Sequence, residues 1–317
     1  MCKITIRTNT FNREHLLPRA VNSVLAQTFT DFQYLIVNNG STDGTQALID
    51  QYKKKDSRIH SVAFPFNSKD TAVELERNKL LEHYYTTPYY MSIDDDDFME
   101  PNTVETLYNL ITQYDADIAQ VGSRFVYPDG TMKDKFVFNG IYVYNRIEAM
   151  VEMLKREKFN QASGGKLFHI DINLKDVEVL KTKQSRDIHH AYRRMNKIRR
   201  MVVTGEPLFY FYRHDKNQSG LETAQQITPQ KMRQHLEANA IRTEWLTENM
   251  PEIKDFVFYC ELSFMISLYE RIHRLDVQSC FDIALEMKET LIRHSAFLKE
   301  CGFLKEHEIQ ILEIMGL

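Results

Sequence analysis

Four aspartates occupy positions 94–97, directly after the short apolar run of residues 89–93 and shortly before Pro101. Neighbouring carboxylates repel one another, so their clustering after a buried strand is favourable mainly when a hard cation such as Mg²⁺ or Mn²⁺ binds among them. A solvated acidic turn would account for the same residues, but acidic runs of that kind usually lie in polar or helical surroundings. The pattern favours a divalent-metal site.

The elements around these aspartates alternate between strand and helix. Apolar residues recur at helical spacing in residues 16–25 and 72–85, and turn-forming residues precede a further helix after residue 45. The expected strands lie between them, at residues 3–8, 32–37, 59–64 and 89–93. This β-α-β order predicts a parallel sheet. In such sheets ligands bind at the carboxyl ends of the strands, where the polar loops are expected to meet the aspartates.

The rest of the chain continues this pattern and then becomes helical. The later elements expected are helices at 102–119 and 145–158 and strands at 121–127, 133–143 and 208–212. Beyond residue 229 glycine and proline are rare and apolar residues recur at helical spacing. The chain is therefore predicted to hold an α/β domain at 1–226 and a helical domain at 227–317. The helical domain carries no cluster of catalytic residue types, and we expect it to position the protein or to mediate homodimerisation.

Composition excludes several classes of protein. With 317 residues, 43% of them hydrophobic, and a formal net charge of -4, the chain suits a globular protein that does not bind nucleic acid through its overall charge. Four cysteines without C-x-x-C spacing indicate neither a zinc site nor a disulfide framework. No signal-peptide pattern and no membrane-length apolar segment is found, which predicts a cytoplasmic protein. Residues 181–200 hold eight Lys or Arg, a candidate for peripheral contact with an anionic membrane or acceptor, or equally a solvated helix face.

Several motifs carry a resemblance to a known family. In chain order they are residues 8–13 (TNTFNR), 23–29 (SVLAQTF), 39–45 (NGSTDGT), 76–79 (ERNK) and 94–97 (DDDD), with later landmarks at 165–168 (GKLF) and 206–213 (EPLFYFYR). Together they resemble the family 2 glycosyltransferases of GT-A fold, over about residues 1–220. The resemblance implies a Rossmann-like nucleotide-sugar-binding domain that uses Mn²⁺ or Mg²⁺. It also implies inverting transfer of a sugar from a nucleoside diphosphate to a hydroxyl of a glycan or lipid-linked acceptor, in bacterial polysaccharide or lipopolysaccharide assembly.

The resemblance also assigns roles to individual residues. Asp94 and Asp96 correspond to the family's D-x-D element, with Asp96 expected to contact the metal directly and His214 as a further candidate ligand. The remaining acids, Asp95 and Asp97, are expected to support the metal ligands or to bind donor hydroxyls. The residues expected to bind the donor are Thr8, Asn9, Asn12, Asn38, Asn39, Asp43, Arg77, Asp94 and Asp95. Two of these residues also suit a different role, because Arg77 could be a solvated helix residue and Asp43 a helix cap.

The chain departs from the family pattern at two places. The family commonly has two aspartates where this chain has Asn38 and Asn39. An amide both donates and accepts, which leaves open that the donor base is held differently or is not uracil. The catalytic base of the family corresponds to Asp187, with Arg186 in place of the usual glutamate. An N-cap role would also account for Asp187, and His189 or His190 could be the base instead.

Two other functions stay open at this point. A sugar-phosphate nucleotidyltransferase would use a similar fold and a metal, but it would need a glycine-rich loop after the first strand, and residues 8–13 contain no glycine. A non-catalytic nucleotide-sugar-binding subunit is compatible with the departures at Asn38, Asn39 and Arg186.

Overall fold

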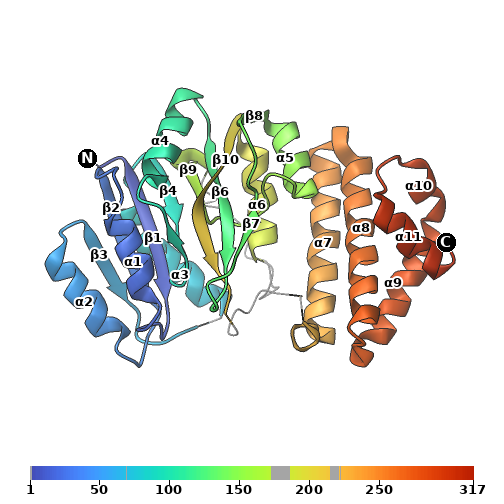
Figure 1. Ribbon diagram of the computed structural model, residues 1–317, viewed down its shortest axis with the longest axis horizontal. Helices are drawn as coiled ribbons and strands as arrows, with labels where there is room; N and C mark the ends of the chain where they lie inside the picture. Colours follow the sequence, from blue (N-terminus) through green and yellow to red (C-terminus); the bar gives the residue numbers. More distant parts are fainter. Residues whose placement is uncertain (1, 69, 173–185, 215–220, 222) are drawn as a thin grey trace. The chain divides into compact units, whose positions relative to one another are not determined.

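The computed structural model describes residues 2–68, 70–172, 186–214, 221 and 223–317 (Figure 1). The chain divides into two compact units. The first, called the sheet unit below, comprises Met1–Lys183 and Arg193–Asp215; the second, the helical unit, comprises Gln184–Tyr192 and Lys216–Leu317. The predicted helical domain lies within the helical unit. The predicted boundary at residue 226 remains a prediction.

One sheet of ten described strands forms the centre of the sheet unit, in the order β3-β2-β1-β4-β9-β6-β10-β5, with β7 beside β6 and β8 beside β10. The strands are β1 (Ile4–Thr10), β2 (Phe32–Asn38), β3 (Ile59–Ala63), β4 (Tyr89–Ser92), β5 (Phe98–Met99), β6 (Ile118–Val126), β7 (Met132–Lys135), β8 (Ile141–Asn145), β9 (Lys166–His169) and β10 (Arg200–Tyr212).

The sheet is mixed, which corrects the prediction of a parallel sheet. Strands β1 to β4 are parallel as predicted, and β6 is parallel to β10. Strand β9 is antiparallel to both of its neighbours, β4 and β6. The tight turn at residues 128–130 reverses the chain after β6, so that β7 runs antiparallel to β6, and β8 and β9 keep this reversed direction. The short strand β5, which precedes the turn, is also antiparallel to its neighbour β10.

Helices lie along the chain between these strands. They are α1 (Leu17–Leu25), α2 (Thr45–Lys55), α3 (Thr71–Leu81), α4 (Thr103–Gln113), α5 (Arg146–Lys155) and α6 (Arg186–Lys197). The prediction of a helix at 102–119 is wrong at its end: Asp115 has a φ of +46°, and β6 begins at Ile118. The predicted strand at 133–143 is divided in two, because Phe136 (φ +57°) and Gly140 (φ +89°) interrupt the extended backbone.

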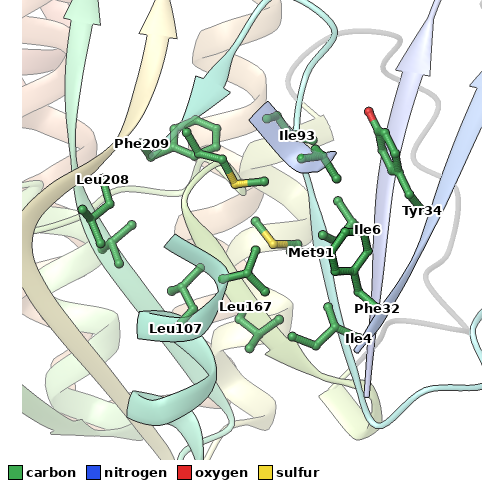
Figure 2. Close-up of a cluster of buried hydrophobic side chains, with 14 of the residues drawn as sticks. Ile4, Ile6, Phe32, Tyr34, Met91, Ile93, Leu107, Leu167, Leu208 and Phe209 are labelled. Atoms are coloured by element: carbon green, nitrogen blue, oxygen red, sulfur yellow. The ribbon is translucent and has the colours of Figure 1, made fainter. Parts of the chain in front are cut away.

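A single apolar cluster joins the sheet to three of its helices. Figure 2 shows part of this cluster, in which side chains of β1, β2 and β4 meet those of α4, β9 and β10. Buried residues of α1, α2 and α4 belong to the same cluster, so these helices share one apolar core with the sheet. Full burial of one such side chain contributes about 1.5–3 kcal/mol. This core gives the strand ends a rigid support.

The register of the central strands brings the polar loops together. Thr10, the last residue of β1, lies beside Asn38, the last residue of β2. The backbone N–H of Asn39 donates to the carbonyl oxygen of Thr10 at 2.9 Å, and Ile93, just after β4, donates to Arg7 at 3.0 Å. The predicted meeting of the loops at the carboxyl ends of β1, β2 and β4 is confirmed.

The helical unit continues with helices from residue 229 on. They are α7 (Pro229–Asn249), α8 (Lys254–Arg274), α9 (Phe281–Arg293), α10 (Ser295–Glu300) and α11 (Glu306–Met315). Helix α7 begins at Pro229, where the Thr228 hydroxyl accepts a hydrogen bond from the Lys231 N–H at 3.3 Å. Helix α8 contributes buried side chains to two apolar clusters, one shared with α7 and α9 and one with α9, α10 and α11. Among the described residues, no helix combines the length and apolarity needed to cross a membrane.

Candidate active site

Three of the four consecutive aspartates converge in the turn between β4 and β5. One carboxylate oxygen from each of Asp94, Asp96 and Asp97 lies within 4.8 Å of the others, and we call these three residues the acidic cluster. The Asp97 N–H donates to the carbonyl oxygen of Asp94 at 3.2 Å, which closes the turn. Within the described part of the chain, no other group of His, Cys, Asp or Glu side chains gathers in this way. Carboxylate oxygens are the ligands preferred by Mg²⁺ and Mn²⁺.

The surroundings of Asp97 explain why a cation fits this cluster. Burial, and then the charges of Asp94 and Asp96, raise the pKa of Asp97 well above its usual value. Its carboxylate accepts a hydrogen bond from the Tyr212 backbone N–H at 3.0 Å. The Arg213 charge partly opposes this rise in pKa, and three neighbouring carboxylates in one turn still repel one another. A divalent cation would compensate this charge, so the donor set fits the metal that the sequence predicts.

Asp95 is not part of the cluster. Its carboxylate lies 3.5 Å from Nε of Arg13, which follows β1. Burial raises the pKa of Asp95 to about 6, and the nearby Arg13 partly opposes this rise. Asp97, which like Asp95 was expected to support the metal ligands or to bind donor hydroxyls, is the third member of the acidic cluster. No sequence signal distinguishes these two acids, because the backbone of the turn decides which way each side chain points.

His214 joins the cluster from a distant part of the sequence. Its Nε2 lies 3.0 Å from Oδ2 of Asp96, and both side chains are largely buried. His214 follows the end of β10, and Tyr212, whose N–H bonds Asp97, is only two residues before it. The structure thus brings together Asp96 and His214 as the sequence suggested. Their binding of a metal remains a prediction.

The loops after β1 and β2 hold each other in place. The Asn12 side chain accepts a hydrogen bond from the Thr42 N–H at 2.8 Å, with Asn12 at a φ of +54°. The Asp43 carboxylate accepts from the Thr45 N–H at 3.0 Å and from the Glu14 N–H at 3.4 Å, while the N-cap position of α2 is Gly44. Asn9 accepts from the Arg7 guanidinium at 2.9 Å. These polar contacts order the loops on which donor binding was predicted.

Two of the side chains predicted to bind the donor are buried and make hydrogen bonds within the protein. The Thr8 hydroxyl is fully buried and bonded to the Tyr34 hydroxyl and the Ile93 carbonyl oxygen. The buried Asn38 amide donates to Gln46 at 2.8 Å and accepts from a backbone N–H of the following loop. Asn39 is different, because its side chain is partly exposed. Of the two amides that replace the family's aspartates, Asn39 is the more exposed, and its contact with the donor base remains a prediction.

Arg77 lies on α3, and its described contacts are with the chain after β3. Its guanidinium donates to the carbonyl oxygen of Phe66 and lies over the rings of Phe64 and Phe66, at 4.5 and 5.1 Å from their centroids. The side chain is 7% exposed, so Arg77 is not a solvated surface residue. Its predicted contact with donor phosphates remains a prediction.

The predicted base and its rivals lie near the start of α6. The side chain of Asp187 lies outside the described residues, so its role remains a prediction. Of the alternative bases, His189 is buried and His190 is partly exposed.

The comparison with known families decides the chain's membership. Residues 5–173, more than half of the chain, match the sequence profile of the family described as "Glycosyl transferase family 2". The chain belongs to glycosyl transferase family 2. The matched range runs from the second residue of β1 to beyond β9 and contains the whole acidic cluster, and it confirms the family that the motifs indicated.

Two proteins named as glycosyltransferases are similar to the chain in sequence. Glycosyltransferase GlyA of Streptococcus pneumoniae serotype 4 is 29% identical over 145 residues, covering 46% of this chain and 20% of that protein. The putative teichuronic acid biosynthesis glycosyltransferase TuaG of Bacillus subtilis is 31% identical over 134 residues, covering 42% of this chain and 52% of that protein. The match thus spans about a fifth of one relative and about half of the other.

The solved structures support the fold of this family 2 chain. S. aureus TarS in complex with UDP-GlcNAc matches with a TM-score of 0.61 and 16% identity, covering 89% of this chain and 75% of that chain. TarS in complex with UDP gives the same TM-score at 15% identity. At these identities the likeness shows the fold alone. It agrees with the GT-A fold expected from the motifs.

Proposed function

We propose that the chain is a metal-dependent, inverting glycosyltransferase that transfers a sugar from a nucleoside diphosphate to a hydroxyl of a glycan or lipid-linked acceptor. The observation that carries this proposal is the acidic cluster at the carboxyl end of β4, in a chain of glycosyl transferase family 2. The family match also favours glycosyl transfer over the nucleotidyltransferase alternative.

The names of the relatives suggest which substrates to test first. TarS was solved with UDP-GlcNAc, so we propose UDP-GlcNAc as the first donor to test. TuaG is named for teichuronic acid biosynthesis, which supports a bacterial cell-surface polymer as the acceptor. We propose that the side chain of Asn39 contacts the donor base.

The acidic cluster and His214 would hold the divalent cation. When bound, this cation stabilises the negative charge that develops on the departing diphosphate. Three carboxylates in one turn would hold this cation at one place relative to the sheet, and a donor bound to it would need less ordering to reach the reactive geometry. The ordered loops after β1 and β2 would bind the nucleoside part of the donor at the neighbouring strand ends.

The transfer itself needs a base. We propose that Asp187 accepts the proton of the acceptor hydroxyl while the hydroxyl oxygen bonds to the anomeric carbon. The bond between that carbon and the phosphate oxygen breaks in the same step, the diphosphate leaves with the electron pair, and the anomeric configuration inverts.

Calorimetric titration of UDP-GlcNAc with and without Mn²⁺ tests the proposal, followed by an assay of UDP release. Binding that requires Mn²⁺, together with slow donor hydrolysis, is expected. A donor present at 100 times its Kd should also stabilise the fold by about 2.7 kcal/mol in a thermal-shift assay, which allows UDP, GDP, CDP and TDP sugars to be compared. Binding without any turnover on donor or on candidate acceptors would favour the non-catalytic subunit instead. No binding of any nucleotide sugar would contradict both.

A further inference from the structure

Arg19, on α1, reaches the turn that carries the acidic cluster. Its Nη2 donates a hydrogen bond to the backbone carbonyl oxygen of Asp96 at 2.6 Å. The same guanidinium lies over two aromatic rings, 3.9 Å from the ring centroid of Tyr212 and 4.8 Å from that of Phe98. One side chain therefore joins a helix, the acidic turn and the strands β5 and β10.

These contacts close a ring around the acidic cluster. Arg19 holds the backbone of Asp96, the carboxylate of Asp96 contacts His214 at 3.0 Å, and the His214 ring lies 5.7 Å from the ring of Tyr212. The Tyr212 ring in turn lies under the Arg19 guanidinium. The Tyr212 N–H also bonds the Asp97 carboxylate at 3.0 Å. Removing the guanidinium would free the backbone of Asp96. It would also remove the cation that packs on the Tyr212 ring, which lies beside His214.

We propose that Arg19 is a positioning residue, which sets the geometry of Asp96, Asp97 and His214 for the cation and the donor. The inference rests on the proposed function, because that function gives the cluster its ligand. A planar guanidinium stacks on a ring face while its edge donates a hydrogen bond in a fixed direction, whereas a lysine ammonium is a compact point charge on a flexible stem and orients these contacts less strictly. Arg19 thus acts through the residues that it holds.

The positive charge of Arg19 alone would suggest a simpler role, which is to offset the charge of the acids. The two roles make different predictions for Arg19→Lys, which keeps the charge and loses the planar group. Positioning predicts that lysine does not rescue binding, while charge compensation predicts that it does. Arg19→Met removes both and keeps most of the aliphatic packing.

Arg58 offers a matched control in the same unit. Its guanidinium also lies over an aromatic ring, at 4.4 Å from the centroid of Phe32, and also donates to a backbone carbonyl oxygen, that of Leu25 at 3.3 Å. It pairs with Asp56 at 2.7 Å, and this acid does not belong to the acidic cluster. Arg58→Met removes the same kinds of contact elsewhere, so it measures the purely structural cost.

The experiment compares the wild type with Arg19→Met, Arg19→Lys and Arg58→Met. Calorimetry measures the Kd of Mn²⁺ with UDP-GlcNAc, release of UDP from UDP-GlcNAc gives kcat/KM, and thermal unfolding measures stability. Crystal structures of the wild type and Arg19→Met give the distance between Asp96 and His214. We expect both Arg19 variants to lose about 10²-fold in kcat/KM, the loss expected from a displacement of about 1 Å. We also expect their Kd to rise and the distance between Asp96 and His214 to lengthen in Arg19→Met. Arg58→Met should lower Tm and leave Kd unchanged.

Several outcomes would overturn the inference. They are full rescue by Arg19→Lys, an Arg19→Met crystal structure with an unchanged turn, and equal losses of affinity in Arg19→Met and Arg58→Met. A wild-type protein that binds no nucleotide sugar would instead contradict the proposed function. In that case the crystal structures alone decide whether Arg19 positions the turn.

Discussion

Two carboxylates, Asp97 in the sheet unit and Glu308 in the helical unit, are equally buried and have opposite surroundings. Asp97 is 4% exposed and Glu308 is 3% exposed. Glu308 accepts hydrogen bonds from the hydroxyls of Tyr259, at 2.6 Å, and Ser263, and from the Lys305 N–H at 2.9 Å. Donors on α8 and at the residue before α11 stabilise its charge. Glu308 therefore links α11 to α8 within the helical unit.

Fewer hydrogen-bond donors are described around the Asp97 carboxylate than around that of Glu308. Its oxygens lie within 4.8 Å of those of Asp94 and Asp96, and burial and these charges raise its pKa. A buried acid therefore does not by itself indicate a binding site. The balance between hydrogen-bond donors and like charges around the acid distinguishes a structural role from a ligand site.

A third buried acid shows that an acid with a structural role also occurs in the sheet unit. Asp117, also in the sheet unit, is 8% exposed, and its Oδ2 accepts from the backbone N–H groups of Arg199 and Arg200 at 2.6 and 3.1 Å. Its Oδ1 also pairs with the Arg199 guanidinium. Asp117 thus resembles Glu308 and not the acidic cluster of its own unit.

Replacement of an acid in the acidic cluster should have the largest effect on donor binding and transfer. If it had none, the contrast between the acidic cluster and the structural acid Glu308 would fail. Asp96→Asn removes a ligand charge, and we expect it to abolish Mn²⁺-dependent donor binding and to reduce transfer below detection while the fold stays intact. Calorimetry with Mn²⁺ and UDP-GlcNAc measures the binding. Asp134→Asn, at an acid that is 62% exposed and paired with Arg124, is the control and should bind normally. Normal Mn²⁺ affinity in Asp96→Asn would refute the metal assignment.

Asp187→Asn extends the comparison to an acid known only by its place in the sequence. Loss of a general base should lower kcat by about 10²- to 10⁴-fold with little change in donor Kd. Steady-state kinetics and calorimetry separate the two effects. A larger loss of kcat in His189→Ala or His190→Ala would identify another base. A variant that only unfolds at lower temperature would favour the capping role.

Glu308→Gln tests the structural side of the comparison. The glutamine oxygen can accept from Tyr259 and the Lys305 N–H, which share one carboxylate oxygen, but the amide NH2 then faces the Ser263 hydroxyl, which in the wild type donates to the other oxygen. The charge-assisted bonds are lost as well, so we expect the helical unit to lose about 1–3 kcal/mol of stability. Urea unfolding measures this loss. Glu306→Gln, at an exposed position two residues before it, should cost much less. Equal stability of the two variants would show that the donors around Glu308 contribute little.

Asp97→Asn should change stability in the opposite direction. The asparagine oxygen can still accept from the Tyr212 N–H, while the repulsion from Asp94 and Asp96 disappears. We expect the metal-free protein to gain about 0.5–2 kcal/mol, and the gain to shrink when Mn²⁺ is added. Thermal unfolding with EDTA and with Mn²⁺ measures both. A loss of stability without metal would place Asp97 in the same class as Glu308.

The smallest effect is expected within the pair of asparagines after β2. Asn39→Asp exchanges a donor for an acceptor and should change the preference among UDP, GDP, CDP and TDP by about 2- to 10-fold, the value of one hydrogen bond. Thermal shifts with each nucleotide give the order of preference. Asn38→Asp is the control, because the internal bonds of Asn38 predict a loss of stability with no new preference. An unchanged order in Asn39→Asp would remove this residue from the base site.

The sequence by itself determined most of the local structure and the family. Apolar periodicity and turn residues predicted the first four strands, their helices and the helical C-terminal part, because these depend on short-range patterns and burial. The aspartates at 94–97 indicated a metal site by their spacing alone, since four adjacent carboxylates after an apolar strand are costly without a cation. The motifs then identified glycosyl transferase family 2.

Only the tertiary structure decided how the side chains are used. The direction of β9 depends on a reversal at residues 128–130 and on pairing with strands distant in sequence, which periodicity does not report. Asp95 and Asp97 differ because the turn directs one to Arg13 and the other into the cluster. The contacts of Arg19 and His214 with Asp96 span 77 and 118 residues. Such contacts arise when α1 and the end of β10 pack against the same turn, and local sequence patterns do not predict them.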